Sequence, residues 1–405
     1  MLLISVDTGE FDAEVSVNEL SELVKTAGGE TEAVIIQKRQ KPDSVTYIGT
    51  GKLDEAREIC DNTEIDVVIC DTELTPTQGR CLEKILGTRV IDRTVLILDI
   101  FAKNARSGEG KLQVELAQLK YSLPRLQGQG TALSRLGGGI GTRGPGESKL
   151  ESDKRHIRRR IHTLEEQLKE LSKRRKLYRE RRKKDGIVTA AIVGYTNAGK
   201  STLLNTLADA DVLAENKLFA TLDPTARAIK LPDGSEVMLI ETEGFISRLP
   251  HFLVEAFKST LEEATSADIL IILADASDPE CEAQLEVTKE ILQELGSEEK
   301  PIITVYNKCD VADSYLLPVT RNTVKISALK KIGIEALLEC ISENMPKNKK
   351  RVLLLLPFSE GSLTNEVRTS SRILKEEYRP EGVFLDAVVD VNIMYKILDY
   401  IVKDE

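Results

Sequence analysis

The chain has no tryptophan, and it has few histidines and cysteines. Three histidines leave almost nothing from which to build a His-based metal site or a Ser/His/Asp triad. The six cysteines show neither CxxC nor Cys/His spacing, which argues against a disulfide framework and against a structural zinc site. The sequence is therefore typical of a protein that works in a reducing compartment.

Long apolar runs are also missing, and none approaches the roughly 18 residues that span a bilayer. The amino terminus meets Asp7 and Glu10 before any basic residue, so we do not expect a secretion signal. We expect a cytoplasmic protein without a membrane span, with a fraction of the molecules associated with membranes. A length of 405 residues predicts two to four domains.

The first 105 residues alternate short apolar runs with polar helical stretches, which predicts a small α/β domain with a mostly parallel sheet. The clearest strands are expected at residues 32–37, 66–70 and 95–100, and helices at 51–62 and 75–86. The glycine-rich segment 47–52 lacks full phosphate-loop spacing, and we interpret it as a turn at a helix start.

Leucines at residues 112, 116, 119, 123 and 126 have the 4-3-4-3 spacing of a coiled-coil seam. Residues 150–171 continue this spacing after a glycine-rich interruption, and Tyr178 lies one heptad beyond Leu171. Two such helices joined by a flexible connection are expected to form an antiparallel hairpin. The glycine-rich tip indicates either a backbone that approaches a partner closely or a plain linker.

The charge is polarised, because residues 149–184 carry 16 Lys and Arg against 6 Asp and Glu in a chain of net charge −10. This distribution fits one basic element that meets a polyanion, and it fits a solvated, salt-bridged helix at least as well.

From residue 188 onward, strand-like and helical segments alternate in the pattern of a doubly wound α/β domain. Strands are expected at residues 188–194, 226–231, 236–242, 268–274, 301–306 and 324–327. A linker at residues 346–350 and a strand-helix-strand-helix segment follow. The whole is expected to comprise an N-terminal α/β domain (1–110), a basic helical hairpin (111–185), a doubly wound α/β domain (186–346) and a small C-terminal domain (351–405), which we describe as α/β or α+β.

A phosphate-binding motif, GxxxxGK[ST], directly follows the first of these strands. Its glycines let backbone N–H groups converge on phosphates, Lys200 supplies a positive charge to the β and γ phosphates, and Ser201 supplies a hydroxyl to Mg²⁺. The motif residues are Gly194, Tyr195, Thr196, Asn197, Ala198, Gly199, Lys200 and Ser201. The motif predicts a nucleoside triphosphate without identifying the base.

Asn307, Lys308, Cys309 and Asp310 form an NKxD motif at the end of a strand, and this motif identifies the base. The Asp310 carboxylate can accept hydrogen bonds from N1–H and the exocyclic amine of guanine, whereas adenine offers no donor at N1. The backbone of Ser327, Ala328 and Leu329 can meet guanine O6. GTP and GDP are therefore the expected ligands, with Mg²⁺ as cofactor.

Two switch segments are expected between these motifs. In the first, Thr221 is the best candidate for a second hydroxyl on Mg²⁺, and Thr225 is the alternative. The neighbouring residues expected to contact GTP are Phe219, Ala220, Leu222 and Asp223. In the second, Gly244 offers its N–H to the γ-phosphate, and Lys200, Thr221 and Gly244 are the candidate catalytic residues.

The second switch reads Glu241-Thr242-Glu243-Gly244, with Glu where a DxxG motif has Asp. The extra methylene is expected to weaken Mg²⁺ binding or slow hydrolysis, since Mg²⁺ demands near-ideal geometry. Phe245 occupies the place where many GTPases have a glutamine that orients water, so turnover without an activator should be slow.

With these motifs in place, nearly the whole chain resembles the HflX family of GTPases. The N-terminal resemblance lies in QKRQKPDSVTYIGTGKLDE and DTELTPTQGRCLEKIL, the hairpin resemblance in LSRLGGGIGTRGPGESKLESDKRHIRRRI, and the switch resemblance in FATLDPTAR and GFISRLPHFLVEAFKSTLEEA. The family motif begins with Asp where this chain has Glu241.

The resemblance implies a factor that binds the large ribosomal subunit and its RNA, and that splits stalled or idle ribosomes under stress. It also implies that the glycine-rich tip reaches the peptidyl-transferase region and that ribosomes stimulate GTP hydrolysis. Arg135, Arg143 and Lys149 around the tip are candidate RNA contacts. We expect a monomer. A GTP-gated assembly factor for the large subunit and an RNA-binding scaffold with an impaired GTPase remain alternatives.

Overall fold

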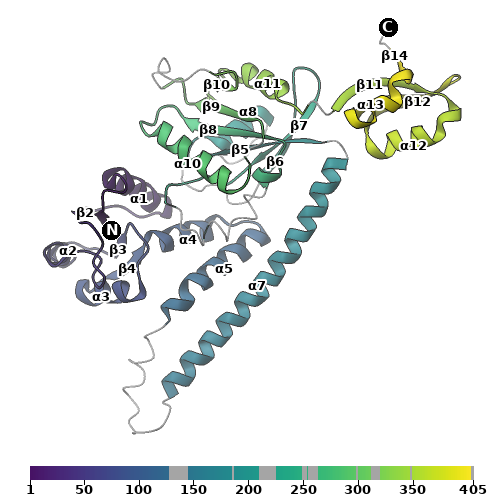
Figure 1. The fold of residues 1–405 in the computed structure, drawn as a ribbon. Helices are drawn as coiled ribbons and strands as arrows, with labels where there is room; N and C mark the ends of the chain where they lie inside the picture. The colour runs from purple at the N-terminus through teal and green to yellow at the C-terminus, as the bar shows by residue number, and fades with distance from the viewer. Residues whose placement is uncertain are drawn as a thin grey trace. The chain divides into compact units, whose positions relative to one another are not determined.

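A computed structural model describes residues 1–126, 145–184, 187–208, 225–248, 253, 263–297, 300–311, 320–346 and 349–402 (Figure 1). The chain divides into two compact units. The first comprises residues 1–171, 215–223 and 243–260, and the second comprises 172–214, 224–242 and 261–405. The segment that follows Thr242 therefore packs with the N-terminal part of the chain.

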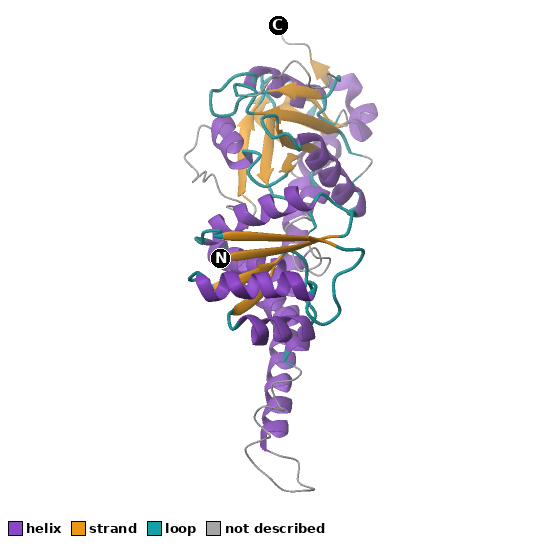
Figure 2. Cartoon of the chain, turned by 90° about the vertical axis from the view of Figure 1, so that its left-hand side faces the viewer, coloured by secondary structure: helices purple, strands orange, loops and turns teal. Residues whose placement is uncertain are grey.

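The N-terminal sheet has four parallel strands in the order β2-β1-β3-β4, with helices on both faces (Figure 2). The strands are β1 (Leu2–Asp7), β2 (Ala33–Lys38), β3 (Val67–Cys70) and β4 (Arg89–Asp92). The helices are α1 (Ala13–Ala27), α2 (Thr50–Asn62) and α3 (Pro76–Leu86). The predicted α/β architecture is confirmed, and Gly49 caps α2 as expected of a turn at a helix start.

The predicted strand at residues 95–100 is wrong, because these residues belong to the helix α4 (Arg93–Asn104). The Asp92 side chain caps this helix by accepting a hydrogen bond from the backbone N–H of Val95 at 3.1 Å. Most of α4 is buried, so its sequence is apolar on nearly all sides. A short apolar run of this kind does not distinguish a buried helix from a strand.

The helices α5 (Gly108–Arg125) and α7 (Pro145–Lys184) form the predicted antiparallel hairpin (Figure 1). Two ion pairs join them, Glu115 with Arg160 at 2.6 Å and Lys120 with Glu165 at 2.7 Å. The seam ends earlier than its spacing predicts, because Leu164 is fully buried whereas Tyr178 is 66% exposed.

The second sheet has six strands in the order β10-β9-β8-β5-β7-β6, all parallel except for the β6–β7 pair. They are β5 (Val188–Gly194), β6 (Thr225–Lys230), β7 (Glu236–Glu241), β8 (Ile269–Asp275), β9 (Ile302–Asn307) and β10 (Thr323–Lys325). The helices α8 (Lys200–Ala208), α10 (Cys281–Glu294) and α11 (Ile334–Glu343) accompany them. The doubly wound pattern is confirmed.

The C-terminal segment is α+β, with an antiparallel sheet of order β12-β13-β11-β14. Its elements are β11 (Lys349–Leu356), α12 (Gly361–Ser370), β12 (Arg372–Arg379), β13 (Gly382–Asp390), α13 (Val391–Ile397) and β14 (Ile401–Val402). The predicted strand-helix-strand-helix order is wrong, since β12 and β13 are two strands. Because β12 is mostly exposed and charged, its sequence lacks the apolar signal of a buried strand. The strand β11 also begins inside the predicted linker.

Candidate nucleotide-binding site

The phosphate loop connects the buried strand β5 to α8 at the carboxyl edge of the second sheet. Gly194, Asn197 and Gly199 have φ angles of 150°, 61° and 96°. A Cβ at Gly194 would collide with the carbonyl oxygen of Leu273, and one at Gly199 would collide with the amide of Asn307. Glycine is therefore required at both positions for sterics as well as for backbone conformation.

Lys200, the first residue of α8, is buried. Its Nζ donates to the carbonyl oxygens of Gly194 at 3.1 Å and Tyr195 at 2.8 Å. These contacts hold the ammonium group over the loop. A fixed positive charge next to a helix amino terminus is the arrangement that binds phosphate.

The second residue of α8, Ser201, donates its hydroxyl to Oε1 of Glu241 at 2.5 Å. Glu241 is the last residue of β7 and is 1% exposed. A hydroxyl and a carboxylate brought together offer the hard oxygen donors that Mg²⁺ prefers, so these residues fit the ion. The described residues contain no cluster of three or more His, Cys, Asp and Glu side chains that could hold a metal.

The guanine motif starts at the end of β9, where Asn307 joins two loops. Its Nδ2 donates to the carbonyl oxygen of Ala198 at 2.8 Å, and its Oδ1 accepts from the N–H of Ala328 at 2.9 Å. Lys308 has a φ angle of 61° and pairs with Asp275 at 2.6 Å. The phosphate loop, the NKxD motif and the Ser327–Leu329 loop are thereby held as one assembly.

The other residues of the NKxD motif and of the 327–329 loop differ in exposure. Asp310 faces solvent, whereas Ser327 and Ala328 are buried. Leu329 is 77% exposed. Burial raises the pKa of the Cys309 thiol, so this side chain is a neutral spacer. An exposed carboxylate beside a fixed loop leaves Asp310 accessible to a base.

The predicted second switch begins within the second unit and continues in the first. Thr242 is fixed by its backbone N–H and its Oγ1, which both donate to the carbonyl oxygen of Ile192, at 3.1 and 3.0 Å. Glu243 and Phe245 are buried, so Phe245 serves as a packing residue.

Several predicted site residues lie outside the described residues. They are Phe219, Ala220, Thr221, Leu222, Asp223, Arg135 and Arg143, and Lys149 lies on α7 without a described side chain. Sequence reasoning missed Asp275, the partner of Lys308. An acidic residue at the end of the strand neighbouring β9 was the available signal.

Comparisons with known proteins agree with this geometry. The chain matches three family descriptions: "GTP-binding GTPase N-terminal" at residues 14–102, "GTP-binding GTPase Middle Region" at 104–182 and "50S ribosome-binding GTPase" at 189–308. It is 50% identical to the GTPase HflX of Caldanaerobacter subterraneus subsp. tengcongensis, over 99% of this chain and 94% of that protein. It is 42% identical to the GTPase HflX of Escherichia coli, over 90% of this chain and 87% of that protein.

Among solved structures, the chain is similar to a GTP-binding protein from Sulfolobus solfataricus in complex with GDP. The two share 29% identity over 85% of this chain and 98% of that chain, with a TM-score of 0.45. Among the described residues, no helix combines the length and apolar character needed to cross a membrane. The sequence relationships over nearly the full length show that the chain belongs to the HflX family of GTPases, enzymes that bind and hydrolyse GTP.

Proposed function

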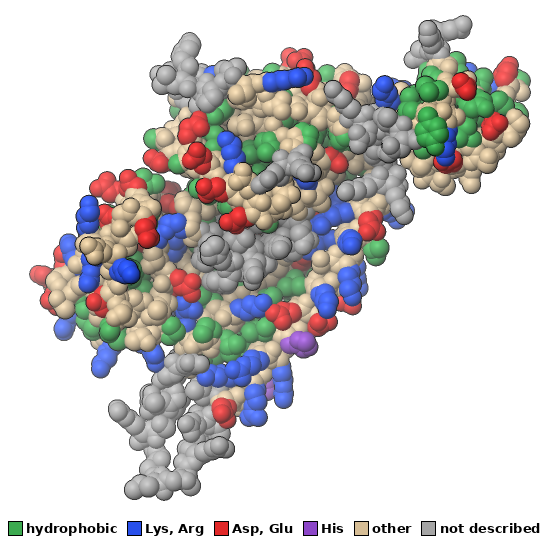
Figure 3. All heavy atoms as spheres, viewed as in Figure 1, with side chains coloured by type: hydrophobic (Ala, Val, Ile, Leu, Met, Phe, Trp, Pro, Cys, Tyr) green, Lys and Arg blue, Asp and Glu red, His purple; other side chains and the backbone are tan. Residues whose placement is uncertain are grey.

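We propose that this GTPase binds the large ribosomal subunit through its RNA and splits stalled or idle ribosomes under stress. The observation that carries this proposal is the charge on α7, a 40-residue helix on whose described surface exposed Lys and Arg outnumber exposed Asp and Glu (Figure 3). A rigid basic helix next to a glycine-rich tip suits a partner made of phosphates. The match to a family described as "50S ribosome-binding GTPase" supports the same partner.

In this proposal the bound nucleotide controls association with the large ribosomal subunit. Lys200 neutralises the β and γ phosphates, Asp310 recognises guanine, and the N–H of Gly244 senses the γ-phosphate. Ser201 and Thr221 would hold Mg²⁺, which neutralises charge on the phosphates when it is bound. Arg135, Arg143 and Lys149 are the proposed RNA contacts at the tip. The protein acts as a cytoplasmic monomer, and a fraction of the molecules associates with membranes.

Sedimentation of intact ribosomes tests the proposal. Ribosomes would be mixed with the full-length protein and GTP, GDP or a non-hydrolysable GTP analogue. We expect separated subunits with the analogue and intact ribosomes with GDP, and GTP turnover faster with ribosomes than without them. Ribosome binding that is the same with GTP, GDP and the analogue would contradict the proposal. A preference for immature large subunits would instead support the assembly factor.

A further inference from the structure

The carboxyl edge of the N-terminal sheet carries a cluster of charged side chains where an open parallel sheet would bind a ligand. In the order β2-β1-β3-β4 the chain leaves β1 to form β2 on one side and then crosses from β2 to form β3 on the other side of β1. The carboxyl ends of β1 and β3 therefore make a topological switch point, which is where open parallel sheets bind ligands. Ser5 lies on β1, and Asp71 directly follows β3.

Asp71 is the centre of this cluster and is fully buried. Its Oδ2 accepts from the hydroxyls of Ser5 at 3.0 Å and Ser16 at 2.8 Å. Its Oδ1 accepts from Nη1 of Arg93 at 3.0 Å, and Nη2 of Arg93 also pairs with Glu19. The N-terminal sheet thus carries a preformed arrangement of two carboxylates and one guanidinium.

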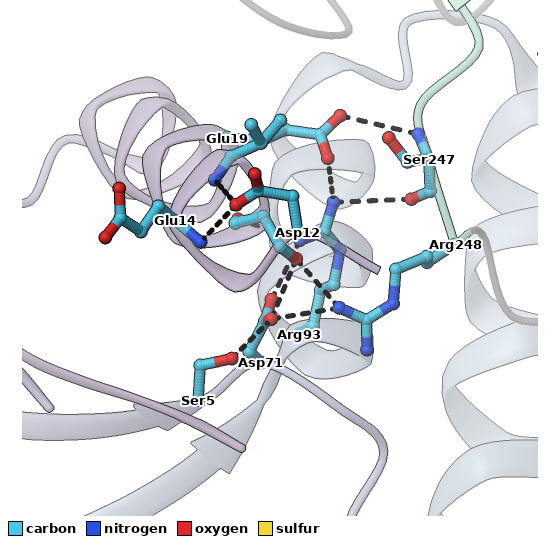
Figure 4. Close-up of polar contacts among 10 residues, drawn as sticks. Ser5, Asp12, Glu14, Glu19, Asp71, Arg93, Ser247 and Arg248 are labelled. Carbon is cyan, nitrogen blue, oxygen red and sulfur yellow. Dashed lines mark hydrogen bonds and ion pairs between the residues drawn. The ribbon is translucent and has the colours of Figure 1, made fainter. Parts of the chain in front are cut away.

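A second guanidinium, that of Arg248, joins these three charged groups from the second switch segment, which lies in the same compact unit (Figure 4). Nη1 of Arg248 donates to Oδ2 of Asp71 at 3.0 Å and to Oγ of Ser16 at 2.8 Å, and its guanidinium stacks on Phe11 at 3.7 Å from the ring centroid. With Arg248 in place, two carboxylates face two guanidiniums and the buried charges balance.

Backbone contacts hold the preceding residue as well. Nη2 of Arg93 donates to the carbonyl oxygen of Ser247 at 3.3 Å, and the N–H of Ser247 donates to Glu19 at 3.4 Å. Arg248 itself has a φ angle of 56°, a conformation that a non-glycine residue keeps only when its surroundings impose it. Side chains of the N-terminal sheet and its helices therefore hold Ser247 and Arg248 in place. We call the side chains of Asp71, Glu19 and Arg93 that hold Ser247 and Arg248 the clamp.

The clamped residues are only a few positions from Gly244 in the sequence. Thr242 is anchored to β5, and Ser247 follows Gly244 by three residues, a path of at most about 11 Å. The segment between Thr242 and Ser247 includes Gly244, whose amide is proposed above to meet the γ-phosphate.

We propose that Asp71, Glu19 and Arg93 are positioning residues for GTP, because they order the switch behind Gly244 before the γ-phosphate arrives. A segment that is already ordered loses less conformational entropy on binding, so the clamp favours GTP. GDP lacks the γ-phosphate and gains nothing from the clamp. This inference rests on the role proposed above for the Gly244 amide.

The test is the Arg248→Met variant of the full-length protein. Its affinity for a non-hydrolysable GTP analogue and for GDP would be measured with Mg²⁺, and GTP turnover would be measured in parallel. We expect analogue binding to weaken by roughly 5- to 150-fold, the usual range of coupling between sites, while GDP binding stays unchanged. Arg248→Lys keeps the charge and should fall between Arg248→Met and the wild type.

The chain offers a matched control in Arg125. This guanidinium pairs with Glu73 at 2.9 Å and stacks on Tyr121 at 3.4 Å from the ring centroid, as Arg248 does with Asp71 and Phe11. It lies in the same unit, and its hydrogen bonds, ion pairs and ring contact involve none of the described switch residues 243–248. Arg125→Met should therefore lower thermal stability without changing the ratio of the two nucleotide affinities.

An Asp71→Asn variant and its double variant with Arg248→Met complete a thermodynamic cycle. The two substitutions should affect analogue binding non-additively, because they remove the same contact. An unchanged affinity ratio in Arg248→Met would overturn the clamp while leaving GTP binding itself intact. Tighter analogue binding would also overturn it, since the clamp would then oppose the γ-phosphate. Failure of the wild type to bind either nucleotide would instead refute the nucleotide site.

Discussion

Single side chains in the nucleotide site each hold more than one loop. The ion pair between Lys308 and Asp275 joins the ends of β9 and β8, and it holds the lysine stem that we propose lies along the purine ring. Motif spacing reveals Lys308, whereas Asp275 becomes part of the site only because β8 and β9 are neighbours in the sheet. Changes at such residues are expected to affect affinity more than folding.

Replacing Asp310 with Asn tests how the base is recognised. In the proposed site the carboxylate accepts two hydrogen bonds from guanine, and losing these charged acceptors would remove about 3 kcal/mol of binding free energy. We expect GDP affinity to fall roughly 100-fold, which corresponds to that free energy. Xanthosine diphosphate should bind the variant better, because its extra carbonyl can accept from the new amide. Titration of the variant with GDP and with xanthosine diphosphate measures the change in base preference. Unchanged GDP affinity would show that Asp310 does not bind the base.

Replacing Glu241 with Asp tests the metal site. Glu241 contacts the Ser201 hydroxyl directly, and a side chain shorter by one methylene leaves room for a metal-bound water. We expect single-turnover GTP hydrolysis to rise about tenfold, equivalent to about 1.4 kcal/mol of barrier, and half-saturation to occur at lower Mg²⁺. If neither the rate nor the Mg²⁺ requirement changes, the extra methylene does not limit catalysis.

At the scale of elements, the motif-bearing strands and the leucine seam were predictable because their signals are local. The strand β5 is a wholly buried run directly before a glycine loop, and the seam repeats every three or four residues. The helix α4 was missed because burial on nearly all sides removes the periodicity that identifies a helix. The polar strand β12 was missed because few of its side chains are buried.

Two leucines on α7 provide a test of the hairpin. Leu164 is fully buried, and Leu177 is 66% exposed. Truncation of Leu164 to Ala should destabilise the packing of α5 on α7 by about 2–5 kcal/mol, since it leaves a cavity. Leu177→Ala should change stability by less than about 0.5 kcal/mol. Hydrogen exchange of the α5 amides measures both effects, and equal protection in the two variants would contradict the predicted packing.

At the scale of the whole molecule, sequence motifs predicted the order of parts but not how the chain groups into units. The contact between Asp71 and Arg248 joins residues 177 positions apart, and no local pattern records it. Charge polarisation was visible in the sequence, and α7 presents it as one helix. We propose that residues 1–110, 111–185, 186–346 and 351–405 form the four domains predicted from the sequence.

Ribosome binding through α7 should depend strongly on salt. Each phosphate neutralised by a basic side chain contributes roughly one unit to the slope of log affinity against log salt concentration. Arg158 and Arg159 are exposed on α7, so reversing both to Glu should weaken binding and reduce this slope by about two units. Reversal of the exposed Lys84 and Lys289 changes the net charge equally and serves as the control. Identical slopes in the two variants would contradict a specific role for α7.

The amide of Asn307 has a consequence for nucleotide exchange. The same side chain holds the loop around the phosphates and, through Ala328, the loop around the base. Neither loop can open alone without breaking a buried hydrogen bond of this side chain. Displacement of this one side chain is therefore expected to free both loops at once, which makes Asn307 the point at which an exchange factor would loosen both ends of a bound nucleotide.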